Sequence, residues 1–249
     1  MNRATRSTPR RPVAIVTGAS RGLGRIIALR LGAGGYRVAV HYHAAETASV
    51  RVCRAIRRSG GQALAVGADL RDPDAADALI TRVLTAWHRL DLLVHNAGVA
   101  HDALVLRMEA AAWHNVIATH LTGGFSLMQA AARPMIRQRG GRIVVIGSLA
   151  GLTGRAGQAN YAAAKAGLIA LSKTAAREWA RHNIRVNCIL PGYLPLGMGR
   201  RLSQAQRRQL LKNSLLGGGS AREVADWIVT LAATRRVSGQ VFNLDSRVV

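Results

Sequence analysis

The sequence predicts an α/β fold, in which a doubly wound parallel sheet of seven strands carries helices on both faces. Short apolar runs alternate with longer segments of helical period along the 249 residues, and this alternation is typical of repeated β-α-β units. Aromatic residues make up only 4% of the chain, while 49% of it is hydrophobic. Valine, isoleucine, leucine and alanine must therefore fill the core, as they do in a parallel sheet that is covered on both sides.

Seven apolar runs define the expected strands, and the segments between them define the helices. We expect strands at 13–17, 37–41, 63–68, 90–95, 142–146, 185–190 and 240–244. Helical periodicity predicts helices at 25–33, 46–59, 74–87, 110–138, 159–181 and 221–233. Each connection is long enough for the right-handed crossover that joins parallel strands. The length suits one domain over residues 12–249 and is short for two.

Two segments stand apart from this regular pattern. Residues 1–11 are basic and lack the apolar stretch of a secretion signal, so we expect a disordered tail. Residues 191–220 contain several glycines and prolines, which indicates either a mobile lid over a site or an ordinary surface excursion. No apolar run reaches the length of a membrane span. Cys53 and Cys188 lack disulfide or metal spacing, so we expect reduced thiols in a cytoplasmic protein.

The chain is strongly basic, with 35 Lys and Arg residues against 12 Asp and Glu and a formal net charge of +23. The basic residues are spread along the whole chain in short doublets, and no nucleic-acid-binding motif accompanies them. We therefore expect no nucleic-acid partner. Two interpretations stay open, a solvated cationic surface and a surface that attracts an acidic partner.

A glycine-rich turn follows the first expected strand, and a helix is expected directly after it. Glycines in such a turn allow the backbone to approach a pyrophosphate closely, and the helix N-terminus favours negative charge. The position of the turn in the first β-α-β unit therefore predicts a Rossmann-type dinucleotide site. The turn contains Gly18, Ser20, Arg21, Gly22, Leu23 and Gly24, within the run Thr17-Gly18-Ala19-Ser20-Arg21-Gly22-Leu23-Gly24.

The end of the second strand indicates which dinucleotide is bound. A site for NAD usually holds a carboxylate there, but no acidic residue occurs between Gly24 and Glu46. His41 takes that place, and Arg21 can pair with a 2′-phosphate, so the sequence favours NADP(H). His41 and His43 share one strand face, yet they lack the third ligand that a metal site needs, so we expect no metal.

Polar residues follow the third and fourth expected strands, at the edge where an α/β sheet binds ligands. Asp69 can accept a hydrogen bond from the adenine amino group, or can instead cap the following helix, and Leu70 lies beside it. Asn96, Ala97 and Gly98 are expected to line the adenosine and to stabilise the core. These residues complete the dinucleotide side of the predicted site.

Three residues around the fifth strand predict the chemistry. Ser148 ends that strand, and Tyr161 and Lys165 lie four apart on one face of the next helix. A phenol with a pKa near 10 is a poor acid at neutral pH, but a cation about 4 Å away is worth roughly 4 kcal/mol, or about three pKa units. We expect Tyr161 to protonate a substrate carbonyl as hydride arrives and Lys165 to activate Tyr161 and to reach the nicotinamide ribose. Ser148 would hold the carbonyl oxygen.

Together these motifs resemble the short-chain dehydrogenase/reductase family, and within it the 3-oxoacyl-[acyl-carrier-protein] reductases. The resemblance implies a Rossmann-type fold, hydride transfer from NADPH, and a homotetramer or dimer built partly from the helices at 110–138 and 159–181. It also implies that Pro191 and Gly192 lie beside the cofactor. It covers nearly all of residues 12–245 and rests on the glycine turn, Asn96-Ala97-Gly98, Ser148, the run 157–168 that contains Tyr161 and Lys165, and Pro191-Gly192.

The sequence departs from the family's pattern at three places. Where the family usually has a catalytic asparagine that anchors a proton-relaying water, this chain has His120. A histidine can bind that water, carry the proton itself near neutral pH, disrupt the relay, or pack in the helix without a catalytic role. After Pro191-Gly192 the family's threonine for the nicotinamide is missing. Residues 243–247 lack the family's paired glycines, so the interface formed by the last strand is expected to differ.

The charge and the resemblance together favour an acyl thioester on acyl carrier protein, because an acidic carrier is attracted to a protein of charge +23. Arg139 lies where the resembled reductases dock their carrier, with Arg137 and Arg181 as neighbours, although each is equally compatible with a solvated arginine. Two alternatives stay open. One is an NADP-dependent alcohol or sugar dehydrogenase with a free substrate, and the other is an NADP-binding subunit without catalysis, which the retained catalytic residues disfavour.

Overall fold

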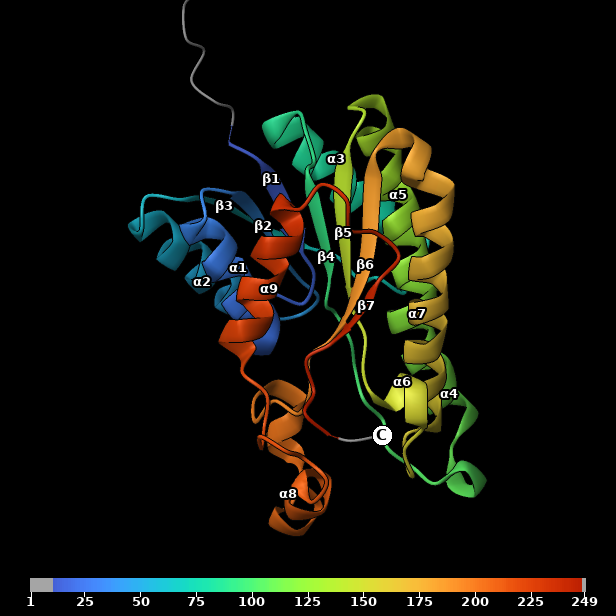
Figure 1. The fold of residues 1–249 in the computed structure, drawn as a ribbon. Helices are drawn as coiled ribbons and strands as arrows, with labels where there is room; N and C mark the ends of the chain where they lie inside the picture. Colours follow the sequence, from blue (N-terminus) through green and yellow to red (C-terminus); the bar gives the residue numbers. More distant parts are fainter. Residues whose placement is uncertain (1–10, 248–249) are drawn as a thin grey trace, which may run out of the picture.

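The computed structural model describes residues 11–247, and the expected tail lies outside the described residues except for its last position. One sheet of seven strands runs through the centre in the order β3-β2-β1-β4-β5-β6-β7 (Figure 1). All six neighbouring pairs are parallel. The chain runs outward from β1 to β3 and then returns to place β4 on the other side of β1. This reversal is the point at which doubly wound sheets bind ligands, and it confirms the predicted fold class.

The strands lie within two residues of their expected bounds, because an apolar run that is buried on both faces has few alternatives in a parallel sheet. They are β1 (Val13–Val16), β2 (Arg37–Tyr42), β3 (Gln62–Gly67), β4 (Leu92–His95), β5 (Gly141–Ile146), β6 (Ile184–Leu190) and β7 (Val241–Asn243).

Helices cover both faces of the sheet (Figure 1). On one face lie α1 (Gly22–Ala33), α2 (Glu46–Arg58) and α9 (Ala221–Ala233), and on the other lie α3 (Ala75–Trp87), α5 (Gly123–Arg137) and α7 (Ala159–Trp179). Strand β1 shows how the two cores are separated. Ala14 and Val16 pack toward the first set of helices, while Val13 and Ile15 pack toward the second. The central strand is therefore buried on both sides.

The helix expected at 110–138 is interrupted in the structure. It consists of α4 (Ala110–Ile117), a π-helical turn η2 (Ala118–Thr122) and α5. Directly after the π turn the helix packs very closely on the sheet. A Cβ at Gly123 would lie 2.5 Å from the carbonyl oxygen of Leu70, and one at Gly124 would lie 2.8 Å from Nε2 of His95. The extra residue in the turn shifts the helix register and places His120 in the interior.

The segment 191–220 lies at the carboxyl edge of the sheet, beside the glycine turn. It contains a short 3-10 turn, η4 (Gly197–Arg201), and α8 (Gln204–Leu211), which projects from the body of the fold (Figure 1). A Cβ at Gly22 would lie 3.6 Å from the Cα of Gly197. The C-terminal residues fasten the segment, since the backbone N–H of Leu215 donates to the carbonyl of Ser246 at 3.0 Å.

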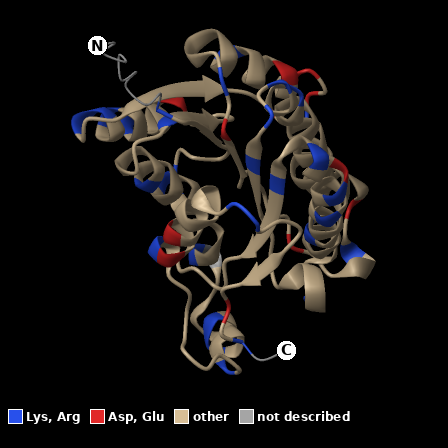
Figure 2. Cartoon of the chain, turned by 45° about the horizontal axis from the view of Figure 1, so that its top comes forward, with Lys and Arg blue, Asp and Glu red and all other residues tan. Residues whose placement is uncertain are grey.

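Short elements without a clear periodic signal complete the fold. They are η1 (Val105–Arg107), α6 (Ala150–Thr153) and η3 (Ala180–His182). Basic side chains are distributed over most of the helices and loops, with fewer acidic ones between them (Figure 2). Among residues 11–247, no helix combines the length and the apolar character that crossing a membrane requires.

Candidate active site

The residues that the sequence singles out gather at the carboxyl edge of the sheet. The glycine turn follows β1, and strands β2 to β6 each contribute residues at the same edge. His41 lies on β2, Asp69 and Leu70 follow β3, Asn96 to Gly98 follow β4, Ser148 follows β5, Pro191 and Gly192 follow β6, and His120, Tyr161 and Lys165 lie on η2 and α7.

Asn96 and Thr17 fasten the glycine turn to the end of β4. The hydroxyl oxygen of Thr17 accepts hydrogen bonds from the backbone N–H groups of Asn96 and Ala97, each at 2.9 Å. The Asn96 amide donates to the carbonyls of Thr17 at 2.9 Å and of Gly18 at 3.3 Å. The sequence does not predict this role of Thr17, because it depends on contacts with the end of β4. The turn is thus held rigidly at the point where the strand order reverses.

Two positions in the turn require glycine, because a Cβ there would come too close to neighbouring backbone atoms. Gly18 has a φ of +61°, and a Cβ there would lie 2.9 Å from the Cα of Ala97. A Cβ at Gly24 would lie 2.4 Å from the carbonyl oxygen of Gly18. Helix α1 begins at Gly22, three residues before its expected start. No side chain caps its N-terminus or adds negative charge to its first turn. Its free N–H groups fit a pyrophosphate.

His41 differs from the sequence-based expectation that its side chain faces the cofactor. It is 2% exposed, its Nδ1 accepts from the N–H of Gly18 at 3.1 Å, and its Nε2 lies 3.1 Å from the carbonyl of Ala68. Both ring nitrogens are therefore used to join the glycine turn to the end of β3. Burial lowers the pKa of His41 to about 4, so the ring is neutral at neutral pH. The exposed histidine at this strand end is His43.

Asp69 is held by Arg71 and does not cap a helix, since α3 begins after Asp74. Its carboxylate accepts from the Arg71 guanidinium at 2.6 Å and lies 3.5 Å from Nε2 of His43. The hydrogen bonds from Arg71 lower the pKa of Asp69 to about 2. Asp69 is thus an ionised acceptor at this edge. Leu70, in contrast, packs its side chain into the core, as Leu23 does.

Tyr161 lies at the start of α7 and is partly buried. Burial is the main effect on its phenol and raises the pKa above the ordinary value of 10, while a hydrogen bond with the Ser148 side chain opposes this rise. Ser148 is oriented in turn, because its Oγ accepts from the backbone N–H of Ala150 at 3.2 Å. The structure therefore brings Ser148 and Tyr161 together and keeps the Tyr161 proton in place at neutral pH.

Lys165 lies one turn after Tyr161 on α7 and is only 3% exposed. Its ammonium donates to the carbonyl of Ile146 at 2.6 Å and lies over the Tyr161 ring, 5.6 Å from the ring centroid. Burial lowers the pKa of Lys165 to about 8. The net shift of the Tyr161 pKa is upward because burial outweighs the opposing effects, and the activation of Tyr161 by Lys165 stays a prediction.

His120 is fully buried against Tyr161. The two rings meet edge to face with centroids 5.3 Å apart. Nε2 of His120 lies 2.8 Å from the carbonyl and 3.0 Å from the N–H of Val99, and Nδ1 has no hydrogen-bond partner among the described residues. Burial and the nearby Lys165 charge hold the pKa of His120 well below 6.5. A lowered pKa favours the neutral ring over the alternative in which His120 carries a proton near neutral pH.

His95 is a buried polar residue of the site that the sequence reading did not single out. Its Nε2 lies 3.1 Å from the carbonyl of His120, and its Nδ1 lies 3.4 Å from the hydroxyl of Thr17. It thus joins the glycine turn to the π turn. Burial, with the Lys165 charge, lowers the pKa of His95 to about 4. The signal for His95 in the sequence is a histidine at the end of an otherwise apolar strand.

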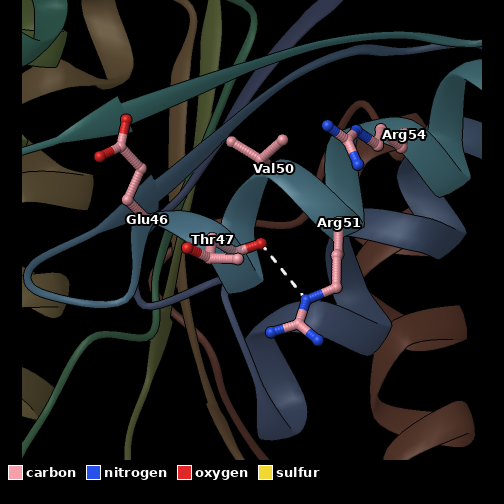
Figure 3. A pocket seen from close by; sticks show the side chains of 5 residues that line it. All are labelled: Glu46, Thr47, Val50, Arg51 and Arg54. Carbon is pink, nitrogen blue, oxygen red and sulfur yellow. Dashed lines mark hydrogen bonds between the residues drawn. The ribbon is translucent and has the colours of Figure 1, made fainter.

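Elsewhere the structure offers little that could compete with this edge. A shallow hollow on the outer face of α2 is lined by side chains of that helix alone, where Arg51 donates to the carbonyl of Thr47 at 3.4 Å (Figure 3). Side chains of a single helix do not enclose a ligand. Within the described part of the chain, no three His, Cys, Asp or Glu side chains gather as metal ligands do.

Comparisons with known proteins agree with this geometry. A family model described as short chain dehydrogenase matches residues 12–207. The chain is 42% identical to a 3-oxoacyl-[acyl-carrier-protein] reductase of Synechocystis sp. over 240 residues, which cover 95% of this chain and 96% of that protein. It is 40% identical to the corresponding reductase of Staphylococcus aureus, over 93% of this chain and 96% of that protein.

Among solved structures, a Sinorhizobium meliloti protein described as a short-chain alcohol dehydrogenase superposes with a TM-score of 0.90. The two sequences are 32% identical, and the match covers 94% of this chain and 95% of the other.

Proposed function

The chain belongs to the short-chain dehydrogenase family, and from that premise we propose that it reduces the 3-oxo group of an acyl thioester on acyl carrier protein with NADPH. The observation that carries this proposal is the arrangement of Ser148, Tyr161 and Lys165 at the same sheet edge as the open N-terminus of α1. This arrangement supports a proton donor that lies beside a dinucleotide site.

The residues of the glycine turn would hold the cofactor. The pyrophosphate would lie at the N-terminus of α1, and the exposed Arg21 would pair with the 2′-phosphate. Asp69 would accept from the adenine amino group. When bound, the nicotinamide supplies the hydride for the carbonyl carbon. Proposing NADPH over NADH rests on Arg21 and on the lack of any acidic residue between Gly24 and Glu46.

Tyr161 acts as the proton donor to the carbonyl oxygen. Its raised pKa keeps the phenol protonated at neutral pH, which is the form that a reduction requires. Ser148 can donate its hydroxyl proton to the same oxygen while its Oγ accepts from the N–H of Ala150. As the proton leaves, the Lys165 ammonium over the ring stabilises the phenolate that forms.

His120 supports this chemistry through its position and not through its charge. Its ring is anchored by Val99 and packs against Tyr161, so it limits how the phenol can rotate. Nδ1 is free to hydrogen-bond a water molecule, the role that the family's asparagine has in the resembled enzymes.

We also propose a cytoplasmic location, in line with the free and buried thiols of Cys53 and Cys188.

The substrate is proposed from the names of the relatives and from the charge. Both sequence relatives are named as reductases of 3-oxoacyl groups on acyl carrier protein. The structural relative is described as an alcohol dehydrogenase, so a free alcohol or sugar is the competing substrate class.

The test measures NADPH oxidation with a 3-oxoacyl group on carrier protein, with the same group on N-acetylcysteamine, and with a panel of alcohols and sugars in the NADP-reducing direction. Turnover of both thioesters, with no comparable turnover of the panel, supports the proposal. Preferred turnover of a free alcohol or sugar contradicts it, and tight NADPH binding without any turnover supports a non-catalytic subunit.

A further inference from the structure

We propose that the α8 arm, defined as residues 197–216, is the surface on which the acidic carrier protein docks. This inference rests on the proposed function and assigns the docking to a particular part of the chain. The arm contains η4, α8 and the residues that lead to Leu216. It projects from the carboxyl edge of the sheet (Figure 1).

The charge of the arm is entirely positive. It contains five basic residues and no acidic one. Arg200, Arg207, Arg208 and Lys212 have exposed side chains, and none of the ion pairs among the described residues involves them. In Figure 2 the ribbon of α8 is coloured for Lys and Arg and not for Asp or Glu. A patch of this kind attracts a partner of negative charge from a distance.

Helix α8 within the arm is not stabilised by a buried apolar face. α8 buries none of its side chains, and it is held at its start by a capping box between Ser203 and Gln206. Most helices in proteins are stabilised by burying an apolar face. α8 thus leaves most of its surface open to contact, with only Leu210 and Leu211 half-buried.

Exposed apolar side chains next to these charges point to a protein partner. Leu215 and Leu216, which follow α8, are 76% and 86% exposed, and Met198 is 42% exposed. A phosphate group is held by converging donors, often backbone N–H groups. Arg200, Arg207, Arg208 and Lys212 are exposed and spread along the arm. Apolar contacts with charges around them are typical of a protein interface.

The arm also lies on the correct side of the molecule. Gly197 approaches Gly22 in the glycine turn, and Arg207 lies over the ring of Tyr193, 6.0 Å from its centroid, close to the end of β6. Arg139, in contrast, precedes β5, whereas Ser148 follows it. The six residues of that strand place Arg139 about 20 Å from the reacting edge of the same chain.

The experiment compares two sets of charge-neutralised variants with the wild type. One is Arg207→Gln with Arg208→Gln and Lys212→Gln, and the control is Arg137→Gln with Arg139→Gln at the opposite edge. We expect the arm variant to raise KM for the carrier-bound thioester about tenfold or more with kcat unchanged. The uncharged N-acetylcysteamine thioester should change less than twofold with either variant, and the control should match the wild type.

Three results would overturn the inference. They are a wild-type KM in the arm variant, a larger loss in the control, and an equal loss with a coenzyme A thioester, which would indicate recognition of phosphate groups. If the wild type reduces no thioester, the proposed function fails. Docking is then decided by fluorescence anisotropy of labelled, acyl-free carrier protein. Binding that the arm variant weakens and the control retains supports the inference, and equal binding or no binding overturns it.

Discussion

The imidazole of His120 meets the phenol ring of Tyr161 edge to face, with 5.3 Å between the ring centroids and 88° between the ring planes. Burial keeps His120 neutral, and Val99 holds its Nε2. The contact therefore orients the Tyr161 ring without adding a charge beside it. The ammonium of Lys165 lies over the same ring, 5.6 Å from its centroid. These relations lead to the following predictions.

The pH dependence of reduction should report Lys165 and not His120. The pKa of Lys165 is lowered to about 8, so its stabilising charge is present below pH 8 and is lost above it. We expect kcat/KM to be flat from about pH 6 to 7.5 and to fall above about pH 8. The measurement is a pH profile of the wild type and of His120→Asn. An inflection near pH 6.5 that disappears in His120→Asn would contradict a neutral His120.

Buried histidines should make the fold sensitive to acid. The pKa values of His41 and His95 are lowered from 6.5 to about 4, so between these pH values the unfolded chain binds more protons than the folded one. The free energy of unfolding should fall as pH decreases from 6.5 to 4, by up to about 3 kcal/mol per histidine.

Urea unfolding at several pH values checks this. His41→Gln should flatten the slope, and His114→Gln, at an exposed position on α4, is the control that should keep the wild-type slope. An equal slope in His41→Gln and the wild type would show that His41 is not the buried neutral group described here.

Gly124→Ala tests the close packing after the π turn. A Cβ at Gly124 would lie 2.8 Å from Nε2 of His95 and 2.9 Å from Cδ2 of Leu168. We expect a loss of about 1–3 kcal/mol in the free energy of unfolding. Gly218→Ala is the matched control, because its Cβ would make only ordinary contacts of 3.4 Å or more. Equal stability of the two variants would disprove this packing argument.

Cofactor selection should depend on Arg21. Arg21→Glu places a carboxylate where a 2′-phosphate would bind, so the Kd for NADPH should rise at least about tenfold while the Kd for NADH changes little. Fluorescence titration with both dinucleotides measures this. Arg25→Glu, an exposed change of the same charge on α1, is the control. Equal losses in the two variants would indicate a general charge effect and no specific contact.

Local signals were sufficient to predict the fold. The strands are continuous apolar runs, and the glycine turn lies between a strand and a helix, so each could be placed from its own residues. The interruption at Ala118–Thr122 could not be predicted, because apolar residues continue at helical spacing through the turn. The turn and the helix after it pack against His95 and Leu70, which are distant in sequence.

The site was predicted in outline, but not in the orientation of its side chains. Ser148, Tyr161 and Lys165 come together because spacing along a helix and the end of a strand are local properties. The ring of His41 is occupied by Gly18 and Ala68, whose positions depend on the assembled sheet. For the same reason the direction of the Lys165 ammonium, which donates to the Ile146 carbonyl, could not be predicted from the sequence.

The most direct test of the account is a single-turnover measurement of Tyr161→Phe with saturating NADPH and a 3-oxoacyl thioester. If Tyr161 donates the proton, the rate of reduction should fall by roughly 10²–10⁴-fold while the affinity for NADPH stays within a few-fold of the wild type. Tyr36→Phe, at the opposite edge of the sheet, should react at the wild-type rate. Reduction by Tyr161→Phe at a rate near that of the wild type would contradict the central claim.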